Sequence, residues 1–203
     1  MKRTKPPMKR KSTKGQNLTS DFIPYAIAQE KGNELLWHSK HPVVGFYIIF
    51  SINTGLRISD IRRIKHSDLI TLQPGDDLRV QERKTGKYRD IQINHKVMDA
   101  YHELRKRIPG VQPDSFIFVS QKGTVYQTPS LILILKKEFY GIAPRISTHS
   151  LRKSFGRHVY ELNGNSEDAL IKLSEMFQHS GMAMTRKYLG LRKEELKDIY
   201  MNL

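Results

Sequence analysis

Four short stretches of the sequence carry polar side chains that folding alone does not explain. In TGLRISD, Arg57 follows a glycine where a helix begins, so its guanidinium and the unpaired backbone N–H groups point the same way, which suits a phosphate. In HSLR, His149 and Arg152 stand three positions apart and therefore share one helix face. Lys84 stands at the edge of a predicted hairpin turn, from which a compact ammonium group can swing into an adjacent groove.

The fourth stretch is QHSGMAMTRKYLG, in which a tyrosine follows a histidine by nine positions. His179 ends a helical pattern, Gly181 breaks it, and Tyr188 follows on a predicted short helix. Taken singly, each stretch has an ordinary explanation: arginines at helix starts are usually solvated, a turn lysine signifies nothing, and most tyrosines pack against neighbours. Taken together, the four stretches match a single reaction.

The elements that position these residues are mostly helical. A proline start and a stop at Gly55 predict a buried helix over PVVGFYIIFSINT. Cap residues and apolar side chains at one-turn spacing predict further helices. Asn94 and Thr128 are the expected N-terminal caps of two of them. These helices are expected within residues 58–65, 94–110, 128–141, 148–164 and 166–179.

The apolar period changes between the helices predicted at 58–65 and 94–110. Leu78 and Val80 alternate before the KTGK turn, and Ile91 and Ile93 alternate after it, which predicts a β-hairpin with Gly86 in its turn. The LITL segment at 69–72 is assigned as a third strand. The predicted fold class is therefore α+β, mostly helical, with a small three-stranded antiparallel sheet.

The charge of the chain indicates a polyanionic partner. It carries 35 Lys and Arg against 20 Asp and Glu, a net charge of +15, and nucleic acid is the usual partner of such a protein. A membrane surface is the alternative, but no long amphipathic helix with a basic face supports it. The chain has no cysteine, which excludes disulfides and thiol catalysis, and its longest apolar run is too short to cross a bilayer. We therefore expect a cytoplasmic protein.

Residues 1–17 are predicted to form a flexible basic arm. This segment has no acidic residue and contains Pro6-Pro7. A solubilising tail is one interpretation, and an arm that grasps DNA phosphates is the one we favour because the rest of the chain is also basic. The expected DNA contacts of the arm are Lys2, Arg3, Lys5, Lys9, Arg10, Lys11 and Lys14.

In order and spacing, the four stretches resemble the sequence boxes of the tyrosine recombinases of the phage integrase type. The resemblance covers residues 18–190 and implies that family's catalytic-domain fold. Most members of the family carry a separate helical DNA-clamping domain before the catalytic domain, and a subset of short members lacks it. The sequence does not decide whether this chain is complete or trimmed. This sequence departs from the usual boxes at Lys153, where a second histidine is common, at Phe177-Gln178, and at Asp60, where glutamate is common.

The resemblance also implies the role of each residue. Tyr188 is expected to attack a DNA phosphorus and form a 3′-phosphotyrosine, with His149 as proton acceptor and Lys84 as general acid. Arg57, Arg152 and His179 are expected to hold the phosphate oxygens, and Asp60 to buttress the site. The reaction conserves the energy of the phosphodiester bond, so no ATP, cofactor or metal is expected.

The expected partners are double-stranded DNA, further copies of the chain and accessory DNA-bending proteins. Lys87 and Lys153 are further expected DNA contacts, and a prokaryotic enzyme of this kind would act at the nucleoid. Residues 191–203 carry an apolar helix stripe of Leu196, Ile199, Tyr200 and Leu203. The stripe is expected either to pack on its own domain or, as is common in this family, to dock on a neighbouring protomer within a dimer or tetramer on DNA.

Three other functions remain possible from the sequence. A type IB topoisomerase would use the same kind of residues to relax supercoils, and a DNA-binding regulator could keep the fold without turnover. A basic RNA-binding protein fits the composition, but aromatic residues are few and no stacking motif of the usual kind occurs.

Overall fold

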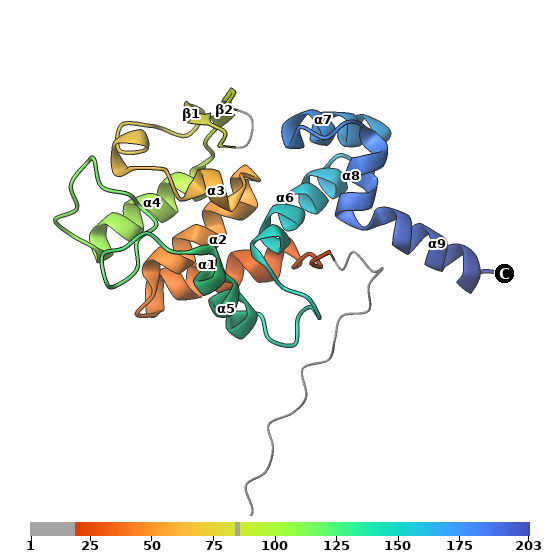
Figure 1. Ribbon diagram of the computed structural model, residues 1–203, viewed down its shortest axis with the longest axis horizontal. Helices are drawn as coiled ribbons and strands as arrows, with labels where there is room; N and C mark the ends of the chain where they lie inside the picture. The colour runs from red at the N-terminus through yellow and green to blue at the C-terminus, as the bar shows by residue number, and fades with distance from the viewer. Residues whose placement is uncertain (1–18, 84–85) are drawn as a thin grey trace, which may run out of the picture.

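The structure is a computed structural model that describes residues 19–83 and 86–203, with only the backbone of Lys193 and Glu195. Figure 1 shows how its elements are arranged. In chain order they are α1 (Tyr25–His38), α2 (Pro42–Thr54), α3 (Ile58–Ile61), η1 (His66–Asp68), β1 (Asp77–Gln81), β2 (Tyr88–Gln92), α4 (His95–Arg107), α5 (Thr128–Glu138), α6 (Thr148–Leu162), α7 (Glu167–Phe177), α8 (Met182–Leu189) and α9 (Leu191–Met201).

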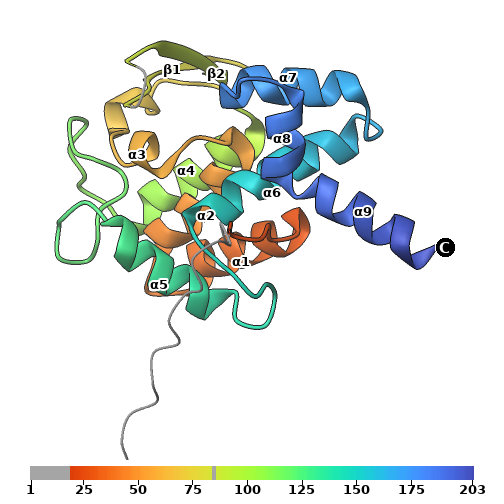
Figure 2. The same ribbon diagram turned by 45° about the vertical axis from the view of Figure 1, so that its right-hand side comes forward.

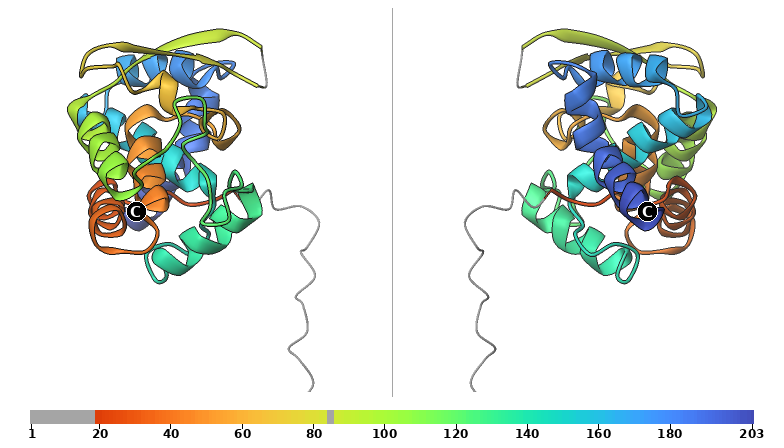
Figure 3. Two further views of the ribbon diagram at one scale, coloured as in Figure 1. Left: turned by 90° about the vertical axis from the view of Figure 1, so that its left-hand side faces the viewer. Right: turned by 90° about the vertical axis from the view of Figure 1, so that its right-hand side faces the viewer.

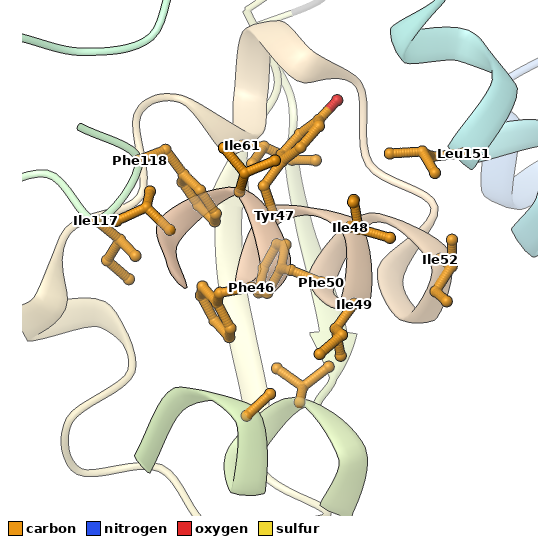
Figure 4. Packing of buried hydrophobic residues seen from close by; sticks show 14 of the residues in the cluster. Phe46, Tyr47, Ile48, Ile49, Phe50, Ile52, Ile61, Ile117, Phe118 and Leu151 are labelled. Carbon is orange, nitrogen blue, oxygen red and sulfur yellow. The ribbon is translucent and has the colours of Figure 1, made fainter. Parts of the chain in front are cut away.

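Helix α2 lies at the centre of the main core, as its apolar sequence predicts. It begins at Pro42, whose missing N–H costs nothing at a helix start, and ends at Gly55 in the left-handed conformation with φ of 62°. Helices α1, α4 and α6 pack against it. Phe46, Phe50 and Phe118 form an aromatic group in this core, with the Phe46 and Phe118 rings stacked 5.6 Å apart (Figure 4).

The sheet contains two strands in the described part of the chain, so the three-stranded prediction is wrong in this detail. Strands β1 and β2 are antiparallel, with Leu78 opposite Ile91 and Val80 opposite Arg89. The predicted third strand at 69–72 forms turns after η1 instead. Its backbone N–H groups bond locally, Leu69 to the His66 carbonyl and Leu72 to the Leu69 carbonyl, so they do not extend the ladder.

The capping predictions hold closely. The Asn94 side chain accepts a hydrogen bond from the Val97 N–H at the start of α4. At α5 the cap is Gln127 rather than Thr128, and the helix begins at Thr128, one residue earlier than predicted. Helix α6, which carries His149 and Arg152, is capped by the Ser147 side chain.

A second, smaller core joins α6 to the last helices. It consists of Phe155, Leu170, Leu173, Phe177, Leu189 and Leu191. Helices α7 and α8 lie beside one end of α6, and the sheet lies at that same end, next to α7 (Figures 2 and 3). Helix α9 continues outward from this core to the C-terminus (Figure 1). Over the described ranges, every helix is too short or too polar to cross a bilayer.

Candidate active site

The structure brings together five of the side chains that the sequence analysis selects. Arg57 immediately precedes α3 with an extended backbone, and His149 and Arg152 lie on α6. His179 follows the end of α7, and Tyr188 is in the last turn of α8. Residues more than 130 positions apart in sequence thus reach one site because both cores end on α6.

The two arginines converge on one acceptor, the backbone carbonyl of Phe177. The Nη2 atoms of Arg57 and Arg152 lie 3.0 and 3.3 Å from the Phe177 oxygen. Arg152 also donates to the Gly55 carbonyl and is 3% exposed, with its guanidinium 4.2 Å from the centre of the Phe177 ring. Two guanidinium groups this close together can grip the two non-bridging oxygens of a phosphate.

Burial lowers the pKa of Arg152 to about 10, with Tyr188 opposing the shift and Arg57 and Arg89 adding to it. The group therefore stays protonated near pH 7. A charge this deeply buried is costly unless a counterion offsets it, so the site has a built-in preference for an anion.

The phenol of Tyr188 lies within this positive field. Burial raises the pKa of Tyr188 to about 12, while Arg152 and Arg57 act in the opposite direction. The Tyr188 Oη is buried and has no well-formed hydrogen bond within the described ranges, although Arg152 is close enough to affect its pKa. Because no well-formed hydrogen bond fixes this oxygen, the backbone of α8 and the packing of the ring set its position.

Two histidine rings face the Tyr188 ring edge-on. The ring centres of His179 and His149 lie 5.1 and 6.5 Å from that of Tyr188. The His179 Nδ1 is 2.9 Å from the hydroxyl of the buried Thr185, which anchors the ring to α8. The His149 side chain remains accessible. Its pKa is lowered, mainly by partial burial and to a smaller extent by the positive charges of Arg152, Lys153 and Arg57. Its imidazole is therefore neutral near pH 7 and able to accept a proton.

A cavity of about 470 Å³ opens beside these groups. Its walls come from the segment before α1, the segment before α6, α6 itself and α8. The lining residues are Thr19, Ser20, Arg145, Ile146, Ser147, His149, Lys153 and Tyr188. The side chains of Tyr188 and His149 thus line one cavity.

Lys153 lies within this wall rather than on the outer surface. Its side chain is 4% exposed, its Nζ donates to the Ser20 carbonyl at 2.6 Å, and it lies 5.1 Å from the centre of the Tyr188 ring. Burial lowers its pKa. This position makes a direct DNA contact by Lys153 difficult without a rearrangement of residues 19–22.

Asp60 supports the hairpin that carries the predicted lysine. Its Oδ1 accepts hydrogen bonds from the Arg83 backbone N–H and from the Ser59 hydroxyl, each at 3.0 Å. Lys84, the next residue after Arg83, lies outside the described residues, as do the seven basic residues of the arm. Lys87 is exposed on the far side of the turn.

Two charged residues of the site escaped the sequence analysis. Glu82 is 1% exposed, and its Oε2 lies 3.1 Å from Arg57 Nη1. Arg89 donates to the Met176 carbonyl at 2.6 Å, and burial lowers its pKa. The signal was present in the strand alternation, because Leu78, Val80 and Glu82 fall on one face of the sheet. Arg89 and Ile91, which lie opposite Val80 and Leu78, project from that same face. A charge on the inward face of a strand needs a buried partner.

These features define a site in which paired arginines, two histidines and a tyrosine have the chemistry to bind a phosphate. The model of the phage integrase family matches residues 38–195, so the chain belongs to this family. The resemblance carried by the four boxes is thereby confirmed, and the fold is that of the tyrosine recombinase catalytic domain.

Curated relatives bear consistent names. The chain is 28% identical over 157 residues to the "Probable integrase/recombinase YoeC" of Bacillus subtilis, covering 76% of this chain and 81% of that one. It is 28% identical over 150 residues to "Tyrosine recombinase XerC" of Nitrobacter winogradskyi, and 31% identical over 157 residues to "Tyrosine recombinase XerD" of Listeria innocua. These two alignments each cover 72% of this chain but only 45% and 50% of the relatives, so the chain spans about half their length.

Solved structures share the fold. The XerA recombinase matches with a TM-score of 0.63 at 18% identity, covering 92% of this chain and 66% of that one. A post-cleavage complex of the XerH recombinase with its palindromic difH substrate matches with a TM-score of 0.65 at 18% identity. The match covers 91% of this chain and 53% of that one. The catalytic domain of bacteriophage HP1 integrase matches with a TM-score of 0.55 at 20% identity, covering 84% of this chain and 87% of that one.

Proposed function

We propose that this chain is a site-specific DNA recombinase that cuts and rejoins strands through a 3′-phosphotyrosine intermediate. The observation that carries the proposal is the meeting of Arg57 and Arg152 on one acceptor beside the Tyr188 ring. The named recombinases among its relatives and the DNA in the XerH complex support the same assignment.

In the proposed reaction, Tyr188 Oη attacks the phosphorus of a DNA backbone phosphate. A bond from Oη to phosphorus forms as the bond to the 5′ oxygen breaks, and the 5′ oxygen leaves as a hydroxyl. A 5′-hydroxyl from the same or another strand then reverses the step. One ester replaces another at each stage, so the phosphodiester energy is kept and ATP is not needed.

The two proton transfers fall to different residues. The phenol, with a pKa raised by burial, must lose its proton in the transition state, and the neutral His149 imidazole is the base near it. Lys84 supplies a proton to the departing 5′ oxygen, because an alkoxide is a poor leaving group. Asp60, by holding the Arg83 N–H, fixes the strand end from which Lys84 follows.

The guanidinium groups stabilise the charge that develops on phosphorus. The scissile phosphate takes the place of the Phe177 carbonyl between Arg57 and Arg152, and His179 adds a hydrogen bond. The arginines carry charge permanently, and Glu82 and the Gly55 carbonyl hold them in position independently of the phosphate. This arrangement supplies the electrostatic stabilisation that a metal ion provides in other nucleases and polymerases.

The whole chain divides into three working parts under this proposal. Residues 18–190 form the catalytic domain, and residues 1–17 are a basic arm that grips DNA phosphates, aided by Lys87. Residues 191–203 form a tail that docks on a neighbouring copy in a dimer or tetramer on DNA. Accessory DNA-bending proteins join the assembly, which acts at the nucleoid.

The test is covalent capture on a nicked suicide duplex that contains the repeats flanking the native locus. After cleavage the short 5′-hydroxyl strand diffuses away, so the protein stays attached and migrates as an adduct in SDS. The wild-type chain should form the adduct, and Tyr188→Phe should bind the duplex equally well without forming it. Relaxation of a supercoiled plasmid without exchange between two sites would instead indicate a topoisomerase.

A further inference from the structure

A buried arginine lies beneath the junction of α8 and α9, outside the phosphate site. Arg157, on α6, is 8% exposed, and its Nε donates to the Leu189 carbonyl at 3.0 Å. Leu189 ends α8 and directly follows Tyr188. Arg157 therefore binds the peptide group at the end of the helix that carries the phenol.

Two other segments hold Arg157 in this orientation. Its Nη2 pairs with the carboxylate of Glu194 in the first turn of α9. Its guanidinium carbon lies 4.6 Å from the centre of the Phe22 ring, in the segment that precedes α1. One guanidinium thus joins the N-terminal segment, α6, α8 and α9, which is more than packing of an isolated helix requires.

Helix α8 needs such an anchor. It has 8 residues, and Gly190, with φ of 82°, ends it in the left-handed conformation that glycine tolerates best. The His179–Thr185 contact holds its middle. At its C-terminal end, Leu189 packs tightly over Gly156 of α6. A Cβ added to Gly156 would lie 2.7 Å from a Leu189 methyl carbon.

We propose that Arg157 is a positioning residue for the Tyr188 nucleophile. By fixing the Leu189 carbonyl it sets the height and rotation of the last turn of α8, and so the distance from the phenol oxygen to the scissile phosphorus. The proposal rests on the recombinase function above. It adds a residue that touches neither the DNA phosphate nor the phenol, and it makes the N-terminal segment and α9 part of what orients the nucleophile.

The expected defect is in chemistry rather than in binding. A displacement of about 1 Å of a reacting group can cost roughly 100-fold in rate. Arg157→Ala should therefore slow single-turnover adduct formation by about 10- to 100-fold, with the Kd for intact duplex within about 2-fold of wild type. Arg157→Lys should recover part of the rate, because one ammonium can donate to the Leu189 carbonyl or to Glu194 but lacks the planar fork that reaches both.

A modified substrate separates positioning of the nucleophile from loss of the general acid. In a duplex with a sulfur in place of the scissile 5′ bridging oxygen, the leaving thiolate needs little help from a proton donor, since a thiol has a pKa of about 8.5. This substrate should restore cleavage by Lys84→Ala, the leaving-group control. It should leave the defect of Arg157→Ala in place.

Two matched variants guard against a general loss of structure. Glu194→Ala removes a half-exposed partner of Arg157 and should slow cleavage by roughly 3- to 10-fold. Lys172→Ala removes an exposed pair with Asp168 on α7 and should cleave like wild type. If Arg157→Ala fails to fold, the Glu194→Ala comparison decides alone.

The proposal is wrong if folded Arg157→Ala and Glu194→Ala cleave at the wild-type rate. It is also wrong if Arg157→Ala loses binding and cleavage equally, or if the sulfur substrate rescues it as it rescues Lys84→Ala. Failure of the recombinase function would be seen differently, as the absence of any adduct with the wild-type chain.

Discussion

At the scale of single residues, each side chain of the site is held by a different kind of contact. Arg152 is buried and bonded to two carbonyls, His179 is tied to a buried threonine, and Tyr188 depends on its helix and on ring packing. The group that must change its bonds is thus placed by its helix and by ring packing, not by a well-formed hydrogen bond to its own oxygen.

The proton-accepting role of His149 predicts an acid limb in the pH dependence of cleavage. Its pKa is lowered from the usual 6.5, so the ring is neutral above that pH, and activity is lost only as pH falls through the lowered value. Because Tyr188 has a pKa of about 12, its own ionisation adds no change between about pH 7 and 9. Single-turnover rates should therefore be flat in this range and decline below pH 6.5.

His149→Gln serves as the control for this profile. Loss of a general base costs roughly 100-fold or more, so the plateau should drop and the acid limb should vanish. An acid limb that survives unchanged in His149→Gln would assign the titration to another group.

Part of the site could be predicted from the sequence at this scale. The boxes contain Arg57, His149, Arg152, His179 and Tyr188 at fixed spacings, so they could be selected before any fold was known. Lys153 was expected at a DNA contact but lies inside the pocket wall, because its partner is the Ser20 carbonyl. A contact between residues 133 positions apart leaves no periodic signal in the sequence.

At the scale of elements, α1 and α2 pack on each other, and both contact α6, which carries His149 and Arg152. Gly45 on α2 faces the α1 backbone, where a Cβ would lie 2.3 Å from the Leu36 nitrogen and 2.6 Å from the Gly32 oxygen. Neither atom can rotate away. The close approach of the two helices therefore depends on the absence of a side chain at this position.

Gly45→Ala should lower the free energy of unfolding by about 3 kcal/mol, even though alanine is the better helix former. Gly32→Ala is the matched control, because its Cβ would meet the side chains of Ile49 and Ile48, which can shift. It should cost clearly less. Urea denaturation measures both, and equal stability of Gly45→Ala and wild type would contradict this account of the interface.

The helices with clear capping or stop residues at their ends could be predicted from the sequence. Pro42 and Gly55 bound α2 as expected, and Asn94 caps α4. The failed third strand at 69–72 has the apolar composition of a strand, but its N–H groups bond back to η1 within three or four residues. A four-residue apolar run does not by itself distinguish a turn packed on a core from a strand.

At the scale of the whole molecule, the described part of the chain has two cores and a projecting helix. The apolar residues of α9 and beyond are largely exposed, among them Ile199 at 58%, Tyr200 at 77% and Leu203 at 98%. Their stripe has no partner on the described part of its own domain that would bury it. The sequence predicted the stripe but could not show that α9 projects away from the core (Figure 1).

Removal of residues 196–203 should therefore change the free energy of unfolding by less than about 1 kcal/mol, since the lost side chains bury little surface. The truncated chain should still cleave a duplex carrying a single site. It should lose cooperative binding to a duplex with two sites, measured by mobility shift against protein concentration. A large loss of stability with unchanged cooperativity would mean that the tail packs on its own domain in solution.

The most direct measurement is to identify the amino acid joined to DNA in the trapped adduct. After nuclease and protease digestion, mass spectrometry of the wild-type complex should find a nucleotide-modified peptide from residues 178–190, with the added mass on Tyr188. A modification on any other residue, or strands cut with no protein attached, would contradict the central claim.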